Sequence, residues 1–210
     1  MQLLIYILIY PILWIISILP FPIFYLFSDF VCFLTYNIFG YRKKVVRENI
    51  KLALPHLSDK ERLVIEKKFY SHMCDMFLEM IKTISISQKE IEKRFTFSNM
   101  EVYYDLEKKN KSIALLCAHY ASYEWVVSMN YHIHCKGFGI YKKLANPYFD
   151  KLVKRIRSKF KAELITTKET IPTIAENHKN NVLGLYGFAS DQSPKANAAY
   201  HWAPFMGHIV

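Results

Sequence analysis

Charge is nearly absent from the start of the chain. Between positions 2 and 39, Asp29 is the single charged side chain. No Lys or Arg precedes this apolar segment and no Ala-x-Ala-like site follows it, so a cleaved signal peptide is not expected. The sequence also lacks a glycine-rich phosphate loop, which argues against the use of ATP.

Cysteine is sparse as well. No Cys-x-x-Cys pair occurs among the four cysteines, which are Cys32, Cys74, Cys117 and Cys135. This pattern is not that of a disulfide framework and fits a reducing compartment. His132 and His134 beside Cys135 are metal-ligand residue types, but a fourth ligand at suitable spacing is missing. We therefore expect no metal site.

The first forty residues form an apolar segment that we interpret as a membrane anchor, residues 1–40. The opening run is long enough for a span of about 20 residues, and Pro11, Pro20 and Pro22 interrupt the segment. Basic residues follow directly from Arg42, and such residues usually stay in the cytoplasm. A single span and a hairpin both place residues 41–210 on the cytoplasmic side. A pair of buried core helices is the alternative.

Nearly all the remaining charge lies in residues 41–210, and it is mostly positive. The net charge is +10 and the isoelectric point is about 9.3. A basic balance indicates an anionic partner: nucleic acid, an acidic membrane surface, or a phosphorylated or carrier-bound substrate. The apolar segment favours a membrane over nucleic acid. The alternative is an ordinary solvated surface.

Residues 41–210 predict one α/β domain with a mostly parallel sheet flanked by helices. Ser58 and Glu61 have capping-box spacing before a long helix, and Ser87 and Glu90 repeat the signal. Short apolar runs predict strands at 112–118, 137–141, 163–166 and 182–186. Helices are predicted between them at 123–133, 146–160 and 170–179. Strands that alternate with helices favour a parallel sheet.

His119 and Glu124 are the candidate catalytic pair. His119 ends the first predicted strand and Glu124 falls in the first turn of the following helix. At such a junction the carboxylate of Glu124 can turn back and orient the imidazole, which then acts as a general base toward a hydroxyl. The alternative is a His that closes a strand and a Glu that complements a helix dipole.

Several ordered blocks give the chain a family resemblance. A His-x4-acid motif follows an apolar strand at His119 and Glu124. Further blocks lie at 43–50, 146–150, 155–160 and Ser190-Asp191-Gln192-Ser193-Pro194. The chain thereby resembles the lipid A biosynthesis acyltransferases of the lysophospholipid acyltransferase-like superfamily. It departs from them at Ala121-Ser122-Tyr123, where the family often has Gly-Asn-Trp. The family's chains continue further, so we expect that a C-terminal part is missing.

The resemblance implies a glycerolipid-acyltransferase-like fold and a membrane-bound O-acyltransferase. It would transfer a fatty acyl chain from an acyl carrier protein or CoA thioester to a hydroxyl of a lipid A precursor. His119 and Glu124 would act without a covalent acyl-enzyme and without a metal or other cofactor. The implied partners are acyl carrier protein and a phosphorylated glycolipid at the cytoplasmic face of a bacterial inner membrane, with no nucleic acid.

The resemblance also assigns substrate-binding residues. Eight Lys and Arg residues lie between positions 142 and 161, and Arg suits bidentate contact with phosphate. Arg157 is the first candidate for an acceptor-phosphate contact, followed by Arg155 and Lys142. Asp191 and Gln192 would brace the site. Two alternatives remain: a related acyltransferase with another lipid acceptor, and a non-catalytic protein whose basic face binds a membrane surface.

Overall fold

The structure is a computed structural model that describes residues 1–192 and 201–209. Its internal contacts divide the chain into two compact units. The first unit contains Met1–Ile18 and Met80–Asp191, and the second contains Leu19–Glu79 and Gln192–Val210. The predicted boundary at residue 40 rests on composition and stays a prediction. Each unit is described by itself below.

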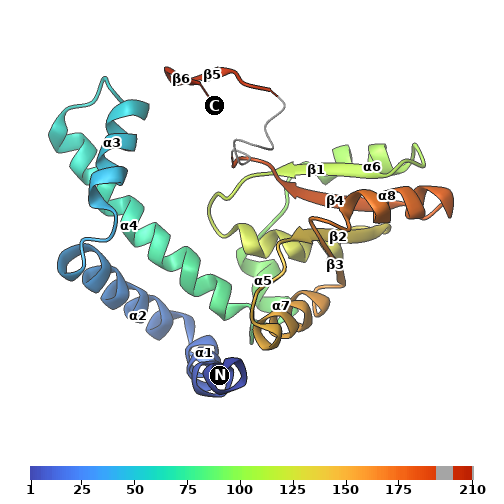
Figure 1. Ribbon diagram of the computed structural model, residues 1–210, viewed down its shortest axis with the longest axis horizontal. Helices are drawn as coiled ribbons and strands as arrows, with labels where there is room; N and C mark the ends of the chain where they lie inside the picture. The colour runs from blue at the N-terminus through green and yellow to red at the C-terminus, as the bar shows by residue number, and fades with distance from the viewer. Residues whose placement is uncertain (193–200, 210) are drawn as a thin grey trace. The chain divides into compact units, whose positions relative to one another are not determined.

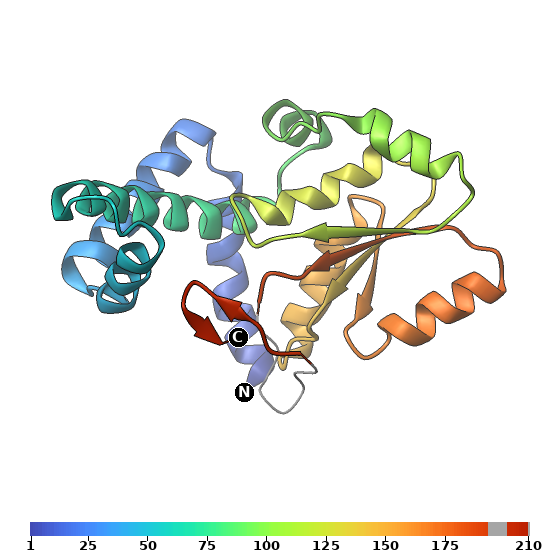
Figure 2. The ribbon, with the colours of Figure 1, turned by 90° about the horizontal axis from the view of Figure 1, so that it is seen from above.

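A four-stranded parallel sheet forms the centre of the first unit (Figure 1). Its strand order is β1-β4-β2-β3. The strands are β1 (Ile113–Cys117), β2 (Lys136–Tyr141), β3 (Ala162–Thr166) and β4 (Gly184–Ala189). Figure 2 shows β1 and β4 side by side with their arrowheads at the same end. The predicted α/β class and parallel sheet are confirmed.

Strand β4 begins and ends later than the predicted 182–186. Val182 still donates its N–H to the carbonyl of Asn177, so this residue belongs to the turn that ends the preceding helix. The strand extends to Ala189 because it lies between β1 and β2 and pairs with both. Tertiary pairing, rather than the apolar run alone, sets its length.

Helices cover both faces of the sheet in the first unit. They are α5 (Gln88–Arg94), α6 (Met100–Glu107), the 3-10 helix η2 (Tyr123–Tyr131), α7 (Pro147–Ser158) and α8 (Thr170–Lys179). Ser87 caps α5, and Asn146 caps α7 through Tyr148 N–H at 3.0 Å. Leu185 packs in one apolar cluster and Tyr186 in another. Neighbouring strand residues point to opposite faces, so the central strand β4 is buried on both sides.

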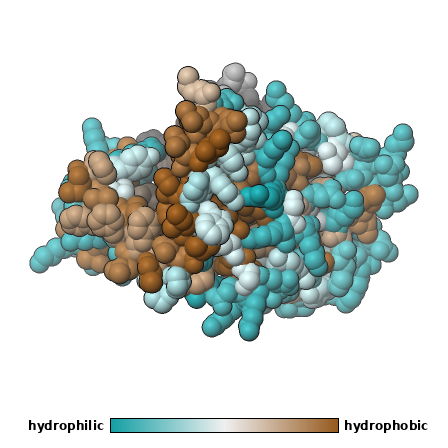
Figure 3. Space-filling view, turned by 90° about the horizontal axis from the view of Figure 1, so that it is seen from below, coloured by the Kyte–Doolittle hydropathy of each residue, from teal (hydrophilic) through white to brown (hydrophobic). Residues whose placement is uncertain are grey.

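Helix α1 (Gln2–Ile18) also belongs to the first unit. Its less exposed side chains include a narrow stripe at Tyr6, Tyr10, Leu13 and Ser17. Most of its other side chains are apolar and exposed. Figure 3 shows brown, apolar side chains gathered over this N-terminal segment.

The second unit is mainly helical. It contains α2 (Phe21–Phe33), the π-helical turn η1 (Leu34–Ile38), α3 (Lys43–Ala53), α4 (Asp59–Lys82) as far as Glu79, and the hairpin β5 (Pro204–Phe205) with β6 (His208–Ile209). The continuous helix Phe21–Ile38 is long and apolar enough to cross a membrane. Glu66 is almost fully buried, and it accepts hydrogen bonds from Arg47 at 2.8 and 3.1 Å.

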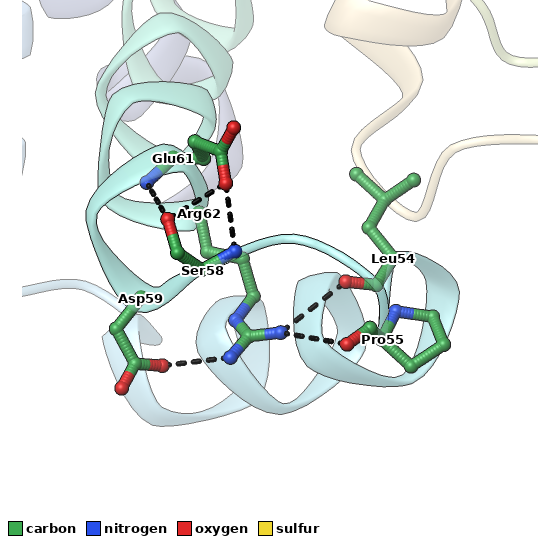
Figure 4. Close-up of polar contacts among 6 residues, drawn as sticks. All are labelled: Leu54, Pro55, Ser58, Asp59, Glu61 and Arg62. Atoms are coloured by element: carbon green, nitrogen blue, oxygen red, sulfur yellow. Dashed lines mark hydrogen bonds and ion pairs between the residues drawn. The ribbon is translucent and has the colours of Figure 1, made fainter.

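The predicted capping box starts α4 (Figure 4). Ser58 donates its backbone N–H to Glu61 Oε2 at 2.8 Å, and Glu61 N–H reaches Ser58 Oγ at 3.4 Å. Arg62 adds a bond to Asp59 at 2.8 Å and contacts the carbonyls of Leu54 and Pro55. The two bonds between Ser58 and Glu61 satisfy N–H groups that a helix start otherwise leaves unpaired.

Candidate functional site

His119 and Asp191 meet at the end of the sheet. β1 and β4 pair in parallel, with Cys117 opposite Ala189. His119 lies two residues beyond Cys117, and Asp191 lies two residues beyond Ala189. Because the two strands are parallel neighbours, these two residues lie side by side. His119 Nδ1 lies 2.7 Å from Asp191 Oδ1, and His119 N–H donates to Oδ2 at 2.9 Å. One carboxylate thus holds both the ring and the backbone of this histidine.

Glu124 forms an ion pair with Arg157 instead of occupying Nδ1 of His119. Arg157 Nη2 lies 2.7 Å from each carboxylate oxygen of Glu124. The two side chains are 17% and 21% exposed, which makes this a well-shielded pair. Glu124 lies in the first turn of η2, and Arg157 comes from the last turn of α7. The sequence predicts that the carboxylate of Glu124 contacts the imidazole, whereas in the structure the partner of Nδ1 is Asp191.

The turn between His119 and Glu124 has an unusual backbone. Ala121 has φ of 51°, in the left-handed region that residues other than glycine seldom adopt. It is also one of the positions where the sequence departs from the Gly-Asn-Trp pattern. The chain therefore keeps the tight turn there without a glycine, at a cost of about 1 kcal/mol.

A largely apolar cavity of about 450 Å³ opens beside this turn. His119, Glu124 and Arg157 line it together with Lys142 and apolar side chains from β1, β2, β3, β4 and η2. Gly139 and Gly187 lie in its wall. A Cβ at Gly187 would meet no neighbouring atom closer than 3.7 Å, so the space beside this strand is open. The cavity is therefore a mostly apolar pocket whose wall also carries polar groups.

A second apolar cavity of about 510 Å³ adjoins the first along β1. The two cavities share wall residues, including Leu115, Cys117 and Met129. Cys117 Sγ donates to the carbonyl oxygen of Phe188 at 3.4 Å. Burial, with a smaller contribution from the charge of Asp191, raises the pKa of the Cys117 thiol. The thiol is therefore held in its neutral form, which is a poor nucleophile.

Asp191 carries its charge at neutral pH. The hydrogen bonds from the His119 ring and backbone lower the pKa of its carboxyl. An ionised carboxylate at Nδ1 holds a proton on that nitrogen, which leaves Nε2 as the acceptor of the ring. This is the tautomer that a general base requires. The His119 side chain is 33% exposed, so its ring is accessible to solvent.

Lys159 anchors the end of α7. Its amino group donates to the carbonyl oxygens of Thr83, Ile84 and Ile86 at 2.6, 3.2 and 3.1 Å. Burial lowers the pKa of this amine. The contacts tie the segment that follows α4 to the chain two residues after Arg157. They hold in place the helix end from which Arg157 reaches Glu124.

The remaining predicted residues lie in different places. Lys142 lines the cavity. Arg155 donates to the hydroxyl of Tyr10 at 2.9 Å and is absent from the cavity wall. Gln192 belongs to the second unit. Ser193 and Pro194 of the same sequence block lie outside the described residues.

His132 and His134, which have metal-ligand side chains, make other contacts in the structure. His134 Nδ1 lies 2.8 Å from Glu107 Oε2, and the carbonyl oxygen of His132 accepts a bond from Tyr104. Within residues 1–192 and 201–209, no three His, Cys, Asp or Glu side chains gather as a metal site would require.

Sequence reasoning missed the pairing of Asp191 with His119, because 72 residues separate the two. A signal was present: each follows the end of an apolar run that becomes a strand. Since neighbouring parallel strands end at the same edge, polar residues just beyond such runs converge. What the sequence did not show was that β1 and β4 are neighbours.

Comparison with known proteins agrees with the arrangement of the blocks. A sequence profile of the family described as bacterial lipid A biosynthesis acyltransferase matches residues 1–208. A lipid A biosynthesis lauroyltransferase of Escherichia coli (strain K12) is 22% identical over 186 residues. The match covers 89% of this chain and 60% of that protein, so the chain spans about three fifths of its relative's length.

Proposed function

Because the chain belongs to the bacterial lipid A biosynthesis acyltransferase family, we propose that its first unit transfers a fatty acyl group from a thioester to a hydroxyl of a lipid A precursor. The observation that carries the proposal is the His119–Asp191 pair beside an apolar cavity. A general base next to an apolar pocket suits a reaction that joins an acyl chain to an alcohol.

In the proposed reaction Nε2 of His119 takes the proton of the acceptor hydroxyl. The oxygen attacks the thioester carbonyl, a carbon–oxygen bond forms, and the carbon–sulfur bond then breaks. The proton on His119 passes to the departing thiolate, so the base is restored. Asp191 holds Nδ1 and stabilises the protonated ring while it carries the proton. This reaction forms no covalent acyl-enzyme, and the neutral thiol of Cys117 is consistent with that.

The cavity supplies the place for the acyl chain. Its walls are mostly apolar, and His119, Glu124 and Arg157 share them. Burial of methylene groups there favours binding by about 0.8 kcal/mol for each group. The chain would lie against the open strand surface at Gly187, with its thioester toward His119.

Arg157 and Lys142 are proposed to bind anionic groups of the substrates. Both line the cavity. The two contacts of Arg157 with Glu124 use Nη2, and its guanidinium also has N–H donors on Nη1 and Nε. Glu124 would therefore act by positioning Arg157 for a phosphate of the acceptor or of a phosphopantetheine carrier. Arg155 is no longer proposed as a phosphate ligand, because its contact is with Tyr10.

The donor, partners and location follow from the same proposal. Acyl carrier protein is the proposed donor and partner, with CoA as the alternative carrier. The proposed location is the cytoplasmic face of a bacterial inner membrane. The family, the apolar helix Phe21–Ile38 and the basic residue Arg42 beyond it support this location.

The test uses the chain purified in detergent, with a radiolabelled acyl carrier protein thioester and a lipid A precursor lacking secondary acyl chains. Mass spectrometry identifies the acylated product. His119→Ala should abolish transfer. His178→Ala is the matched control, because His178 is exposed on α8 and does not line the cavity. Retained transfer in His119→Ala would contradict the proposed role of His119.

A panel of acceptors tests the substrate. The proposal expects transfer to the lipid A precursor and none to glycerol phosphate or ornithine lipid. Transfer only to another lipid would support acyltransferase activity and would identify that lipid as the acceptor in place of the lipid A precursor. Absence of transfer to every acceptor by a chain that binds anionic vesicles would favour a non-catalytic membrane protein.

A further inference from the structure

Tyr123 contacts the candidate base in the wall of the cavity. Its ring meets the His119 ring with centroids 4.8 Å apart and planes inclined by 66°. Both residues line the cavity of about 450 Å³. Tyr123 begins η2, directly before Glu124. The reaction proposed above uses neither the ring of Tyr123 nor its hydroxyl.

The hydroxyl of Tyr123 has a weak hydrogen-bond partner. Within the described residues its contact is with Met80 Sδ at 4.0 Å, and a thioether sulfur is a poor acceptor. Met80 also lines the cavity, so the hydroxyl lies where two side chains of the cavity wall meet. Tyr123 is half-buried, and a polar group shielded from water gains more from a good acceptor than an exposed one does. Its proton is therefore available to a substrate atom in the cavity.

The surroundings of Tyr123 keep this hydroxyl protonated. Burial raises the pKa of its phenol, the carboxylates of Glu124 and Asp191 raise it further, and the charge of Arg157 opposes them. The titratable ring of His119 touches it as well. At neutral pH the hydroxyl thus donates a hydrogen bond and does not act as a base.

Two backbone N–H groups near the candidate base already have acceptors. The N–H of His119 donates to Asp191 Oδ2 at 2.9 Å. The N–H of Tyr123 donates to the carbonyl oxygen of Ala121 at 2.8 Å. Acyl transfer is accelerated by donors aimed at the oxygen that becomes negative in the transition state. These two amides are engaged within the turn, whereas the Tyr123 hydroxyl keeps a donor for such an oxygen.

We propose that the Tyr123 hydroxyl donates a hydrogen bond to the carbonyl oxygen of the acyl thioester and is a catalytic residue of the proposed transfer. As the acceptor oxygen bonds to the carbonyl carbon, the π electrons move onto the carbonyl oxygen, which becomes an oxyanion. The hydroxyl stabilises this charge and keeps its proton, and the carbonyl forms again when the carbon–sulfur bond breaks. Because the rings of His119 and Tyr123 touch, one thioester group can meet both. The inference rests on the proposed function and assigns it a further residue.

Tyr123→Phe tests the donor, because it removes the hydroxyl and keeps the ring. The charge on the carbonyl oxygen develops only in the transition state, so kcat should fall about 100-fold while KM for the acyl carrier protein thioester changes less than about twofold. Tyr104→Phe is the matched control, since Tyr104 is also half-buried, donates to the carbonyl oxygen of His132 and does not line the cavity. A kcat for Tyr123→Phe equal to that of the control would overturn the proposal.

A fluorinated tyrosine separates a donor from a side chain that only packs. Tyr123→3,5-difluorotyrosine keeps the hydroxyl and lowers the pKa of the phenol, so the donor proton is lost at a lower pH. The alkaline limb of the kcat profile should therefore move to lower pH. A limb that stays in place would overturn the proposal. This variant retains the hydroxyl and its contacts, so it decides the question even where Tyr123→Phe fails to fold.

The same assays separate this inference from the proposed function. If the parent chain transfers the acyl group and both Tyr123 variants behave like it, only the role of Tyr123 is refuted. If His119→Ala keeps the transfer rate of the parent chain, the general-base reaction is refuted, and the role of Tyr123 in it is refuted as well.

Discussion

Replacement of Asp191 by Asn tests which carboxylate orients His119. The substitution keeps the size of the side chain and removes its charge. Asp191 accepts from His119 Nδ1 at 2.7 Å and from its backbone N–H at 2.9 Å. A hydrogen bond to a charged group contributes about 1.5–3 kcal/mol. The two side chains are 33% and 35% exposed, so we expect a value at the lower end of this range.

Each 1.36 kcal/mol of lost transition-state stabilisation lowers a rate about tenfold. Asp191→Asn should therefore lower kcat about tenfold. KM for the acyl donor should change little, because Asp191 does not line the cavity. The assay is steady-state acyl transfer with varied donor, and Asp105→Asn on the exposed surface of α6 is the matched control.

The pH dependence of stability gives a second measurement on the same variant. The contacts with His119 lower the pKa of Asp191, so the folded state holds this proton more weakly than the unfolded chain. The stabilisation is present above the unfolded value of about 3.9 and is lost as the pH falls through the lower folded value. Asp191→Asn should remove this part of the acid dependence. A kcat within twofold of the parent chain would refute the assignment and return the orienting role to Glu124.

Glu124→Gln and Arg157→Gln should each lower kcat/KM at least tenfold, and the double variant should be no worse than the single ones, because the two side chains form one ion pair; additive losses in the double-mutant cycle would contradict this. Cys117→Ala should keep at least a third of the activity, since burial raises the pKa of its thiol and the proposed reaction has no acyl-enzyme; mass spectrometry of an acylated Cys117 would show otherwise. Lys159→Met should lower the free energy of unfolding by about 1–3 kcal/mol in urea titrations, because it leaves the three carbonyl groups it contacts without this donor. Ser58→Ala should cost about 1 kcal/mol in the same measurement through loss of the α4 cap.

Local sequence was sufficient for several helix starts, for two of the strands and for the type of fold. Ser58 with Glu61, Ser87 and Asn146 marked helix starts that the structure confirms. The apolar runs at 112–118 and 137–141 became β1 and β2. These features depend on hydrogen bonds and side-chain periodicity within a few residues, so a short window of sequence contains their cause.

While the family resemblance supplied Arg157, the same local reasoning selected His119 and Glu124, and all three residues line one cavity. It paired Glu124 with the wrong partner, because spacing along the chain gives the distance between residues but not the direction of a side chain at a turn. The φ of 51° at Ala121 and the 3-10 winding of η2 are properties of the folded turn. Arg157 of α7 forms an ion pair with the Glu124 carboxylate.

The sequence by itself was enough to name candidate residues for the chemistry and to predict that strands end beside them. Only the tertiary structure decided that β4 lies next to β1, and hence that Asp191 rather than Glu124 meets Nδ1 of His119. It also decided that α1 lies along α7, a contact that joins Tyr10 to Arg155 across 145 positions. The physical reason is the same in both cases. Strand order and helix docking are chosen by the burial of whole surfaces, and no local pattern contains that information.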